Sequence, residues 1–163
     1  MLYGVVMTVI FYQISFFPLG AEDFGPLYWI DAGGAAISAL SGATLILRAA
    51  DWPILSAYLP FLRGATLSVW AAATFWIPFL VAMTAWRYAI RRDRFRYEPR
   101  LWGAVFPIGM YSAATFMLAR AEGLPFLDPL ARAFAFAGLG AWSIAAASLL
   151  ASLFPSTKAA GAE

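Results

Sequence analysis

Residues 66–90 read TLSVWAAATFWIPFLVAMTAWRYAI and contain a single charged residue, Arg87, close to the end of the stretch. About 20 consecutive apolar residues are enough to cross the hydrocarbon core of a bilayer as a helix. The whole chain agrees with this stretch, since 63% of its 163 residues are hydrophobic, 12% are charged and the mean hydropathy is +0.74. Soluble domains carry about 25% charged residues. The sequence therefore predicts an all-α membrane protein.

Four further stretches resemble residues 66–90 in apolar character, and proline, glycine and charged residues separate them. Together the stretches predict about five transmembrane helices in one bundle over residues 1–154, at residues 2–19, 27–47, 66–90, 101–119 and 130–154. Residues 155–163 are small and polar, which predicts a disordered tail.

Basic residues gather at the joint between the third and fourth predicted spans, at Arg87, Arg91, Arg92, Arg94, Arg96 and Arg100. Loops rich in lysine and arginine face the cytoplasm. With five spans, the C-terminal tail lies on the same side as this joint, so we expect a multi-pass protein of the cell membrane with a cytoplasmic C-terminus. A site for an anionic lipid or for a substrate is the alternative interpretation of this cluster.

The sequence contains no cysteine and no histidine. It therefore has no thiolate or histidine ligand for a metal, no histidine for a haem and none of the commonest general base. Because no nucleophile with a suitable base is visible, we expect no enzymatic activity and no cofactor. The net charge of +2 and the pI near 9.2 do not indicate nucleic-acid binding, since membrane topology explains where the arginines lie.

Small residues recur at every fourth position of the second predicted span, at Gly34, Ser38 and Gly42. Residues four apart lie on one face of a helix. A face of this kind allows two helix backbones to pack closely in lipid. It can equally leave a gap for a permeating solute, although this helix alone favours close packing.

The fourth predicted span contains Pro107, which removes a backbone donor and favours a kink. Irregular helices at membrane depth border cavities. Phe106 stands beside the proline, and an ordinary packed aromatic is the simpler interpretation of it. Most polar side chains of the predicted spans are hydroxyls, which can line a path for an anion or bond to the preceding helical turn.

Three segments in order are similar to one known family. They are residues 11–19 (FYQISFFPL) with Glu22, Asp23 and residues 28–31 (YWID); residues 33–43 (GGAAISALSGA); and residues 97–111 (YEPRLWGAVFPIGMY) with Ala114 and Thr115. They resemble the tellurite-resistance/dicarboxylate transporter (TDT) family, which includes the plant slow-type anion channels. The third segment is the most specific. Asp31 departs from the family's preference for asparagine, and Gly34 from its commoner alanine.

The resemblance implies a fold of ten helices in five hairpins around a central pore, usually in trimers, with this chain as the C-terminal half. The second and fourth predicted spans are then inner helices, and Phe106 matches the phenylalanine that closes the pore. The resemblance also implies a pore lined by Gly34, Ser38, Ser41, Gly42, Gly103, Pro107, Gly109, Met110 and Thr115.

The expected function is therefore transmembrane transport of small anions, such as C4-dicarboxylates, tellurite-type oxyanions, or chloride and nitrate. Because two of five inner helices cannot enclose a pore, we expect a fragment of a longer transporter. The expected partners are the lipid bilayer, small anions, and either a missing N-terminal half or other copies of the chain. The alternative is a small accessory membrane subunit that packs against a larger complex and transports nothing.

Overall fold

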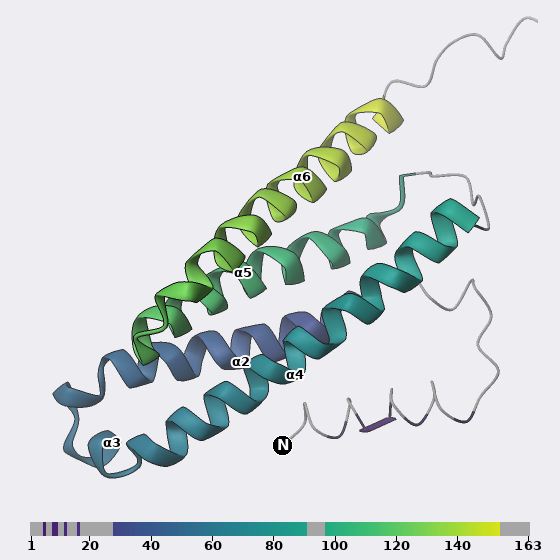
Figure 1. The fold of residues 1–163 in the computed structure, drawn as a ribbon. Helices are drawn as coiled ribbons and strands as arrows, with labels where there is room; N and C mark the ends of the chain where they lie inside the picture. Colours follow the sequence, from purple (N-terminus) through teal and green to yellow (C-terminus); the bar gives the residue numbers. More distant parts are fainter. Residues whose placement is uncertain are drawn as a thin grey trace, which may run out of the picture.

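The computed structural model describes residues 28–90 and 97–153, together with residues 5, 8, 9, 12 and 16. The regular elements of this part of the chain are helices, and four of them are long and apolar enough to cross a membrane (Figure 1). An all-α membrane protein is thereby confirmed. The rest of the predicted first span at residues 2–19, the arginines of residues 91–96 and the predicted tail at 155–163 lie outside the described residues.

The four long helices are α2 (Trp29–Leu47), α4 (Leu59–Ala85), α5 (Trp102–Glu122) and α6 (Asp128–Leu153). Short helical segments connect or extend them, namely η2 (Ala49–Asp51), α3 (Pro53–Ala57), η3 (Trp86–Ile90), η4 (Pro99–Leu101) and η5 (Pro125–Leu127).

Two prolines in the predicted joint between the second and third spans begin helices instead of separating them. Pro53 lies in the first turn of α3, and Pro60 lies in the first turn of α4. The missing N–H of proline costs little there, because the first N–H groups of a helix have no intrahelical partner. As a result α4 begins at Leu59, whereas the sequence predicted a start at residue 66.

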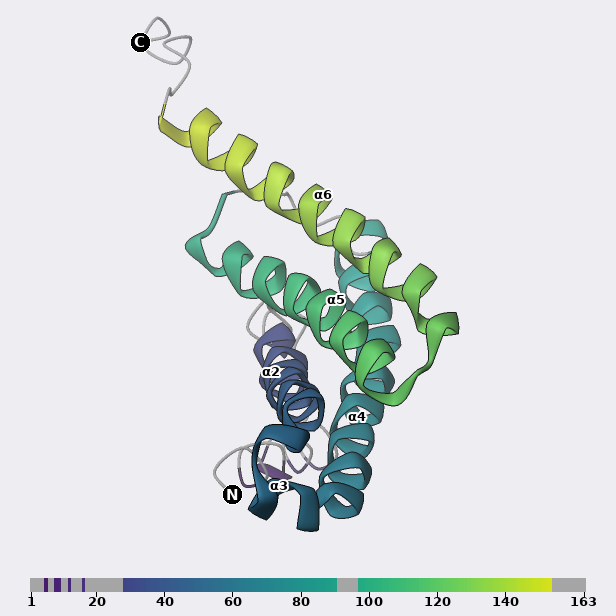
Figure 2. The same ribbon diagram turned by 90° about the vertical axis from the view of Figure 1, so that its left-hand side faces the viewer.

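The helix α2 packs against both α4 and α5, and α6 packs against the other side of α5 (Figures 1 and 2). The centre of this packing is built from alanines that are 0% exposed, namely Ala35, Ala36 and Ala39 of α2, Ala73 of α4 and Ala114 of α5. Small side chains let helix backbones approach closely, which drives helix association in lipid. The alanines therefore explain why α2 holds the bundle together.

A tight turn places α6 beside α5. Gly123, which follows α5, has φ +66°, in the left-handed region that favours glycine. The backbone N–H of Leu124 donates to the carbonyl oxygen of Ala119 at 2.8 Å, which satisfies one of the last carbonyls of α5. Asp128 in the first turn of α6 is favourable at the positive end of the helix dipole.

Polar side chains link α4 to α5 inside the bundle. The indole Nε1 of Trp70 donates to Oγ1 of Thr115 at 2.9 Å, and the hydroxyl oxygens of Thr74 and Tyr111 lie 2.7 Å apart. The rings of Trp70 and Tyr111 stack with 6.2 Å between their centroids. Because an unpaired buried donor is costly, these bonds favour one register of α4 against α5.

The Trp70–Thr115 hydrogen bond can be tested by changing its acceptor. Thr115→Val is expected to destabilise the protein by about 1–3 kcal/mol, because it leaves the indole N–H of the partly buried Trp70 without this acceptor. Thr115→Ser keeps a hydroxyl and is expected to lose less. Thermal unfolding of the detergent-solubilised protein, followed by tryptophan fluorescence, measures both. Equal stabilities of the two variants would contradict a structural role for this bond.

Candidate functional site

The helix α5 turns one face away from the packed core. Phe106, Gly109, Phe116 and Arg120 are exposed, and their spacings of three, seven and four residues place them along one side of the helix. Phe106 is 51% exposed although its neighbour Pro107 is buried. The predicted gate residue therefore points out of the described bundle.

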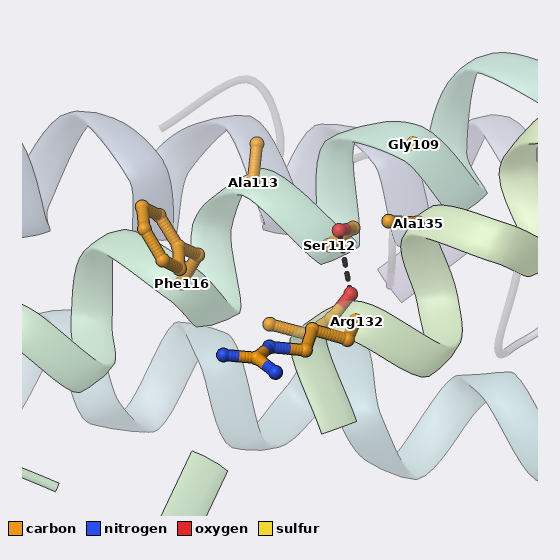
Figure 3. Close-up of a pocket in the computed structure, with 7 residues that line it drawn as sticks. Gly109, Ser112, Ala113, Phe116, Arg132 and Ala135 are labelled. Carbon is orange, nitrogen blue, oxygen red and sulfur yellow. Dashed lines mark hydrogen bonds between the residues drawn. The ribbon is translucent and has the colours of Figure 1, made fainter. Parts of the chain in front are cut away.

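A groove of about 430 Å³ runs between this face of α5 and the first turns of α6 (Figure 3). Its lining residues include Gly109, Ser112, Ala113, Phe116, Arg132 and Ala135. Arg132 is the one charged residue that lines the groove, and its guanidinium extends along the groove toward Phe116 (Figure 3). A groove with a cationic group and no carboxylate in its lining suits an anion better than a cation.

Two glycines shape the groove. A Cβ atom on Gly138 of α6 would lie 3.4 Å from the Cα atom of Gly109, so the backbones of α5 and α6 meet at this point. A Cβ atom on Gly109 itself would meet nothing within 4 Å, so the missing side chain leaves open space. In the lining of the groove, Oγ of Ser112 donates to the carbonyl oxygen of Ala131 at 2.7 Å and holds the two helices together (Figure 3).

On α2, three of the residues predicted to line a pore lie on or near the exposed face. Ser38 and Ser41 are exposed, and Gly34 is half-buried. Oγ of Ser38 donates to the carbonyl oxygen of Gly34 at 2.9 Å. The proton of this hydroxyl is thus engaged by the preceding turn, as serine commonly is in membrane helices. An anion at Ser38 gains that donor only if the hydroxyl rotates.

The helix α4 lies beside both α2 and α5 (Figure 2). The helix α4 contacts α2, where Nε1 of Trp29 donates to Oγ1 of Thr84 at 3.3 Å. It contacts α5 through the Trp70–Thr115 hydrogen bond. Because α4 packs against both helices, we refer to the exposed faces of α2 and α5 that it leaves uncovered as the open side of the bundle.

Three other residues of the predicted lining lie in the packing and not on this open side. Gly42 is buried against Thr66 of α4, where any Cβ atom would overlap Oγ1 of that threonine. Pro107 is buried against α2, where a Cβ atom on Gly33 would lie 3.0 Å from its Cγ atom. Thr115 is buried and accepts the hydrogen bond from Trp70. The small face of α2 thus serves close packing at Gly42 and stays open at Ser38.

The last two residues of the predicted lining, Gly103 and Met110, are half-buried on α5. Met110 packs against the alanine cluster. Phe116 and Arg132, which line the groove, were not predicted as site residues. The spacing of Phe116 from Phe106 and Gly109 could have indicated it. No local signal could have indicated Arg132, because it comes from α6 and reaches the groove through the turn at Gly123.

Comparison with known proteins identifies the family. The chain belongs to the SLAC1 family, described as voltage-dependent anion channel, whose family model matches residues 1–150. It is therefore a multi-pass membrane protein of a channel family and not of an enzyme family, and the expected resemblance to anion channels is confirmed at this level.

Several relatives are similar to the chain over most of its length. Two uncharacterized membrane proteins of Mycobacterium tuberculosis, from strains CDC 1551 and H37Rv, are each 32% identical over 149 residues, which cover 91% of this chain and 75% of each relative. An uncharacterized transporter of Methanocaldococcus jannaschii is 27% identical over 129 residues, which cover 78% of this chain and 35% of that transporter. No solved structure matches the chain.

Proposed function

We propose that the chain forms part of the wall of a pore for small anions, with the open faces of α2 and α5 toward the pore and Phe106 as its gate. The permeant classes are C4-dicarboxylates, tellurite-type oxyanions, and chloride or nitrate. The observation that carries this proposal is the exposed face of α5. On it a half-exposed phenylalanine precedes a groove whose lining includes glycine, alanine and one arginine.

The ring of Phe106 is suited to the role of a gate for a simple physical reason. A hydrophobic constriction stops ions because water leaves it and the ion must shed its hydration shell to pass. A ring that projects from the open face of an inner helix forms such a constriction when other inner helices stand opposite. The hydroxyls of Ser38 and Ser41 on α2 then supply part of a polar wall.

Two lining helices do not enclose a pore, so the proposal includes a completed assembly. We take the chain as the C-terminal half of a ten-helix fold, with a cytoplasmic C-terminus, in trimers. The match to the M. jannaschii transporter supports the view that this chain corresponds to part of a longer transporter, since the match covers 78% of this chain but only 35% of that protein.

An immunoblot of native membranes with an antibody against the C-terminal tail tests whether the native product is longer. A band well above 17.7 kDa supports a longer product. A band at that mass with an unrelated stoichiometric partner favours the accessory-subunit alternative.

The groove on α5 gives the pore proposal a direct test. Gly109→Leu is expected to lower anion flux into proteoliposomes about tenfold, which corresponds to about 1.4 kcal/mol of added barrier, because the new side chain fills the groove. Gly140→Leu on α6 is the matched control, since a Cβ atom there also meets nothing within 4 Å and Gly140 does not line the groove. If both variants conduct like the unchanged protein, the groove is not part of the anion path.

A further inference from the structure

A second hollow adjoins the groove at the end of α5. It measures about 350 Å³, and its lining includes Phe116, Arg120, Gly123, Asp128 and Arg132. Phe116 and Arg132 line both the groove and this hollow. Arg132 therefore stands at the junction between the two spaces.

Two guanidinium groups and one carboxylate border this hollow. The guanidinium carbon of Arg120 lies 4.2 Å from the centre of the Phe116 ring, a cation–π arrangement that holds Arg120 over the aromatic face. Arg132 is exposed, and among the described residues no carboxylate oxygen lies within 4.0 Å of its guanidinium, Asp128 included. Its fork of N–H donors is thus available to a ligand.

The position of Arg120 along α5 gives the arrangement a direction. Arg120 and Phe106 are 14 residues apart, or roughly 21 Å at 1.5 Å per residue, on the same exposed side of the helix. The groove at Gly109 and Ala113 lies between them. Arg120 thus lies at the end of the open face that is remote from the proposed gate.

We propose that Arg132, assisted by Arg120, forms an anion-capture site at the α5–α6 end of the groove, where a carboxylate, an oxyanion or a small inorganic anion binds before it moves along α5. This inference rests on the proposed function. Guanidinium is weakly hydrated and presents parallel N–H donors that match two oxygens of a carboxylate or oxyanion. Nearby low-dielectric walls strengthen the attraction and raise the local anion concentration.

The test compares Arg132→Gln with Arg48→Gln in the full chain. Arg48 follows α2 at the same end of the bundle, is exposed, and lines neither space, so its loss removes the same charge without touching the site. We expect Arg132→Gln to raise the half-saturating malate or nitrate concentration for flux about tenfold, equivalent to about 1.4 kcal/mol. Arg132→Lys is expected to raise the half-saturating concentration less than Arg132→Gln does. Arg48→Gln is expected to change that concentration little. Equal effects of the two glutamine variants overturn the proposal.

A binding readout separates this site from the transport proposal. In lipid-free detergent, malate or nitrate is expected to raise the unfolding temperature of the unchanged protein and to lose this effect in Arg132→Gln. If the protein shows this stabilisation but no anion flux, the anion-binding site at Arg132 is supported and the proposed pore is wrong. If phosphatidylglycerol stabilises the protein through Arg132 while malate, nitrate and tellurite do not, the guanidinium holds a lipid headgroup, and the capture site for soluble anions is wrong.

Discussion

Phe106→Ala is expected to raise anion flux through the assembled protein about tenfold or more. The ring is half-exposed on the open face of α5, and truncation to a methyl group removes most of the apolar surface that it projects. A wider and better hydrated constriction lowers the cost of shedding water from the permeating anion. A tenfold rise corresponds to about 1.4 kcal/mol taken from the barrier. Planar-bilayer conductance in symmetric nitrate, normalised to the amount of inserted protein, measures the change.

Two controls separate gating from a general disturbance of the fold. Phe136→Ala removes an equally large ring from α6 that is 75% exposed and does not line the groove, so we expect it to leave conductance unchanged. Phe106→Trp retains an aromatic plug and is expected to stay closed. Because Phe106 is exposed, Phe106→Ala costs little core packing. Unchanged conductance in a correctly assembled Phe106→Ala protein would contradict the assignment of Phe106 as the gate.

The fold class could be predicted from sequence because it depends on a local property. Long apolar stretches must be helical in lipid, where every backbone polar group needs an internal partner. Helix boundaries were harder to predict, because a proline can either separate two helices or lie in the first turn of one. Pro60 was predicted to be part of a joint, but it lies in the first turn of α4. The sequence around Pro60 is compatible with both a joint and a helix start. Which of the two forms depends on whether the following residues pack as one helix.

The candidate site could be predicted only in part, because lining and packing residues look alike in an apolar helix. Gly34 and Gly42 share one row of small residues, yet only Gly42 is covered by Thr66 of α4. Thr115 carries a hydroxyl suited to a pore, yet Trp70 binds it in the core. Which neighbour covers a helix face is a tertiary property. The periodicity of α5 was available in the sequence, whereas the contribution of Arg132 from α6 was not.

Gly42→Ala is expected to destabilise the protein by about 1–3 kcal/mol, the usual cost of overpacking. The added Cβ atom would overlap Oγ1 of Thr66 and would lie 3.0 Å from both the Cβ and the Cγ2 atoms of that residue. The Thr66 hydroxyl cannot move away freely, because it donates to the carbonyl oxygen of Leu62 at 2.7 Å. The helices α2 and α4 must therefore separate slightly. Thermal unfolding in detergent measures the loss.

Gly64→Ala in α4 is the matched control, since a Cβ atom there meets nothing within 4 Å and the change is expected to be neutral or to stabilise by up to about 1 kcal/mol. Thr66→Ala combined with Gly42→Ala is expected to restore part of the stability, because it removes the overlapping oxygen. The same series decides what Gly42 does. If Gly42 packs α2 against α4, Gly42→Ala lowers stability and leaves anion flux per folded protein unchanged. If Gly42→Ala changes flux at unchanged stability, the residue faces the pore, and α2 must be rotated relative to α4.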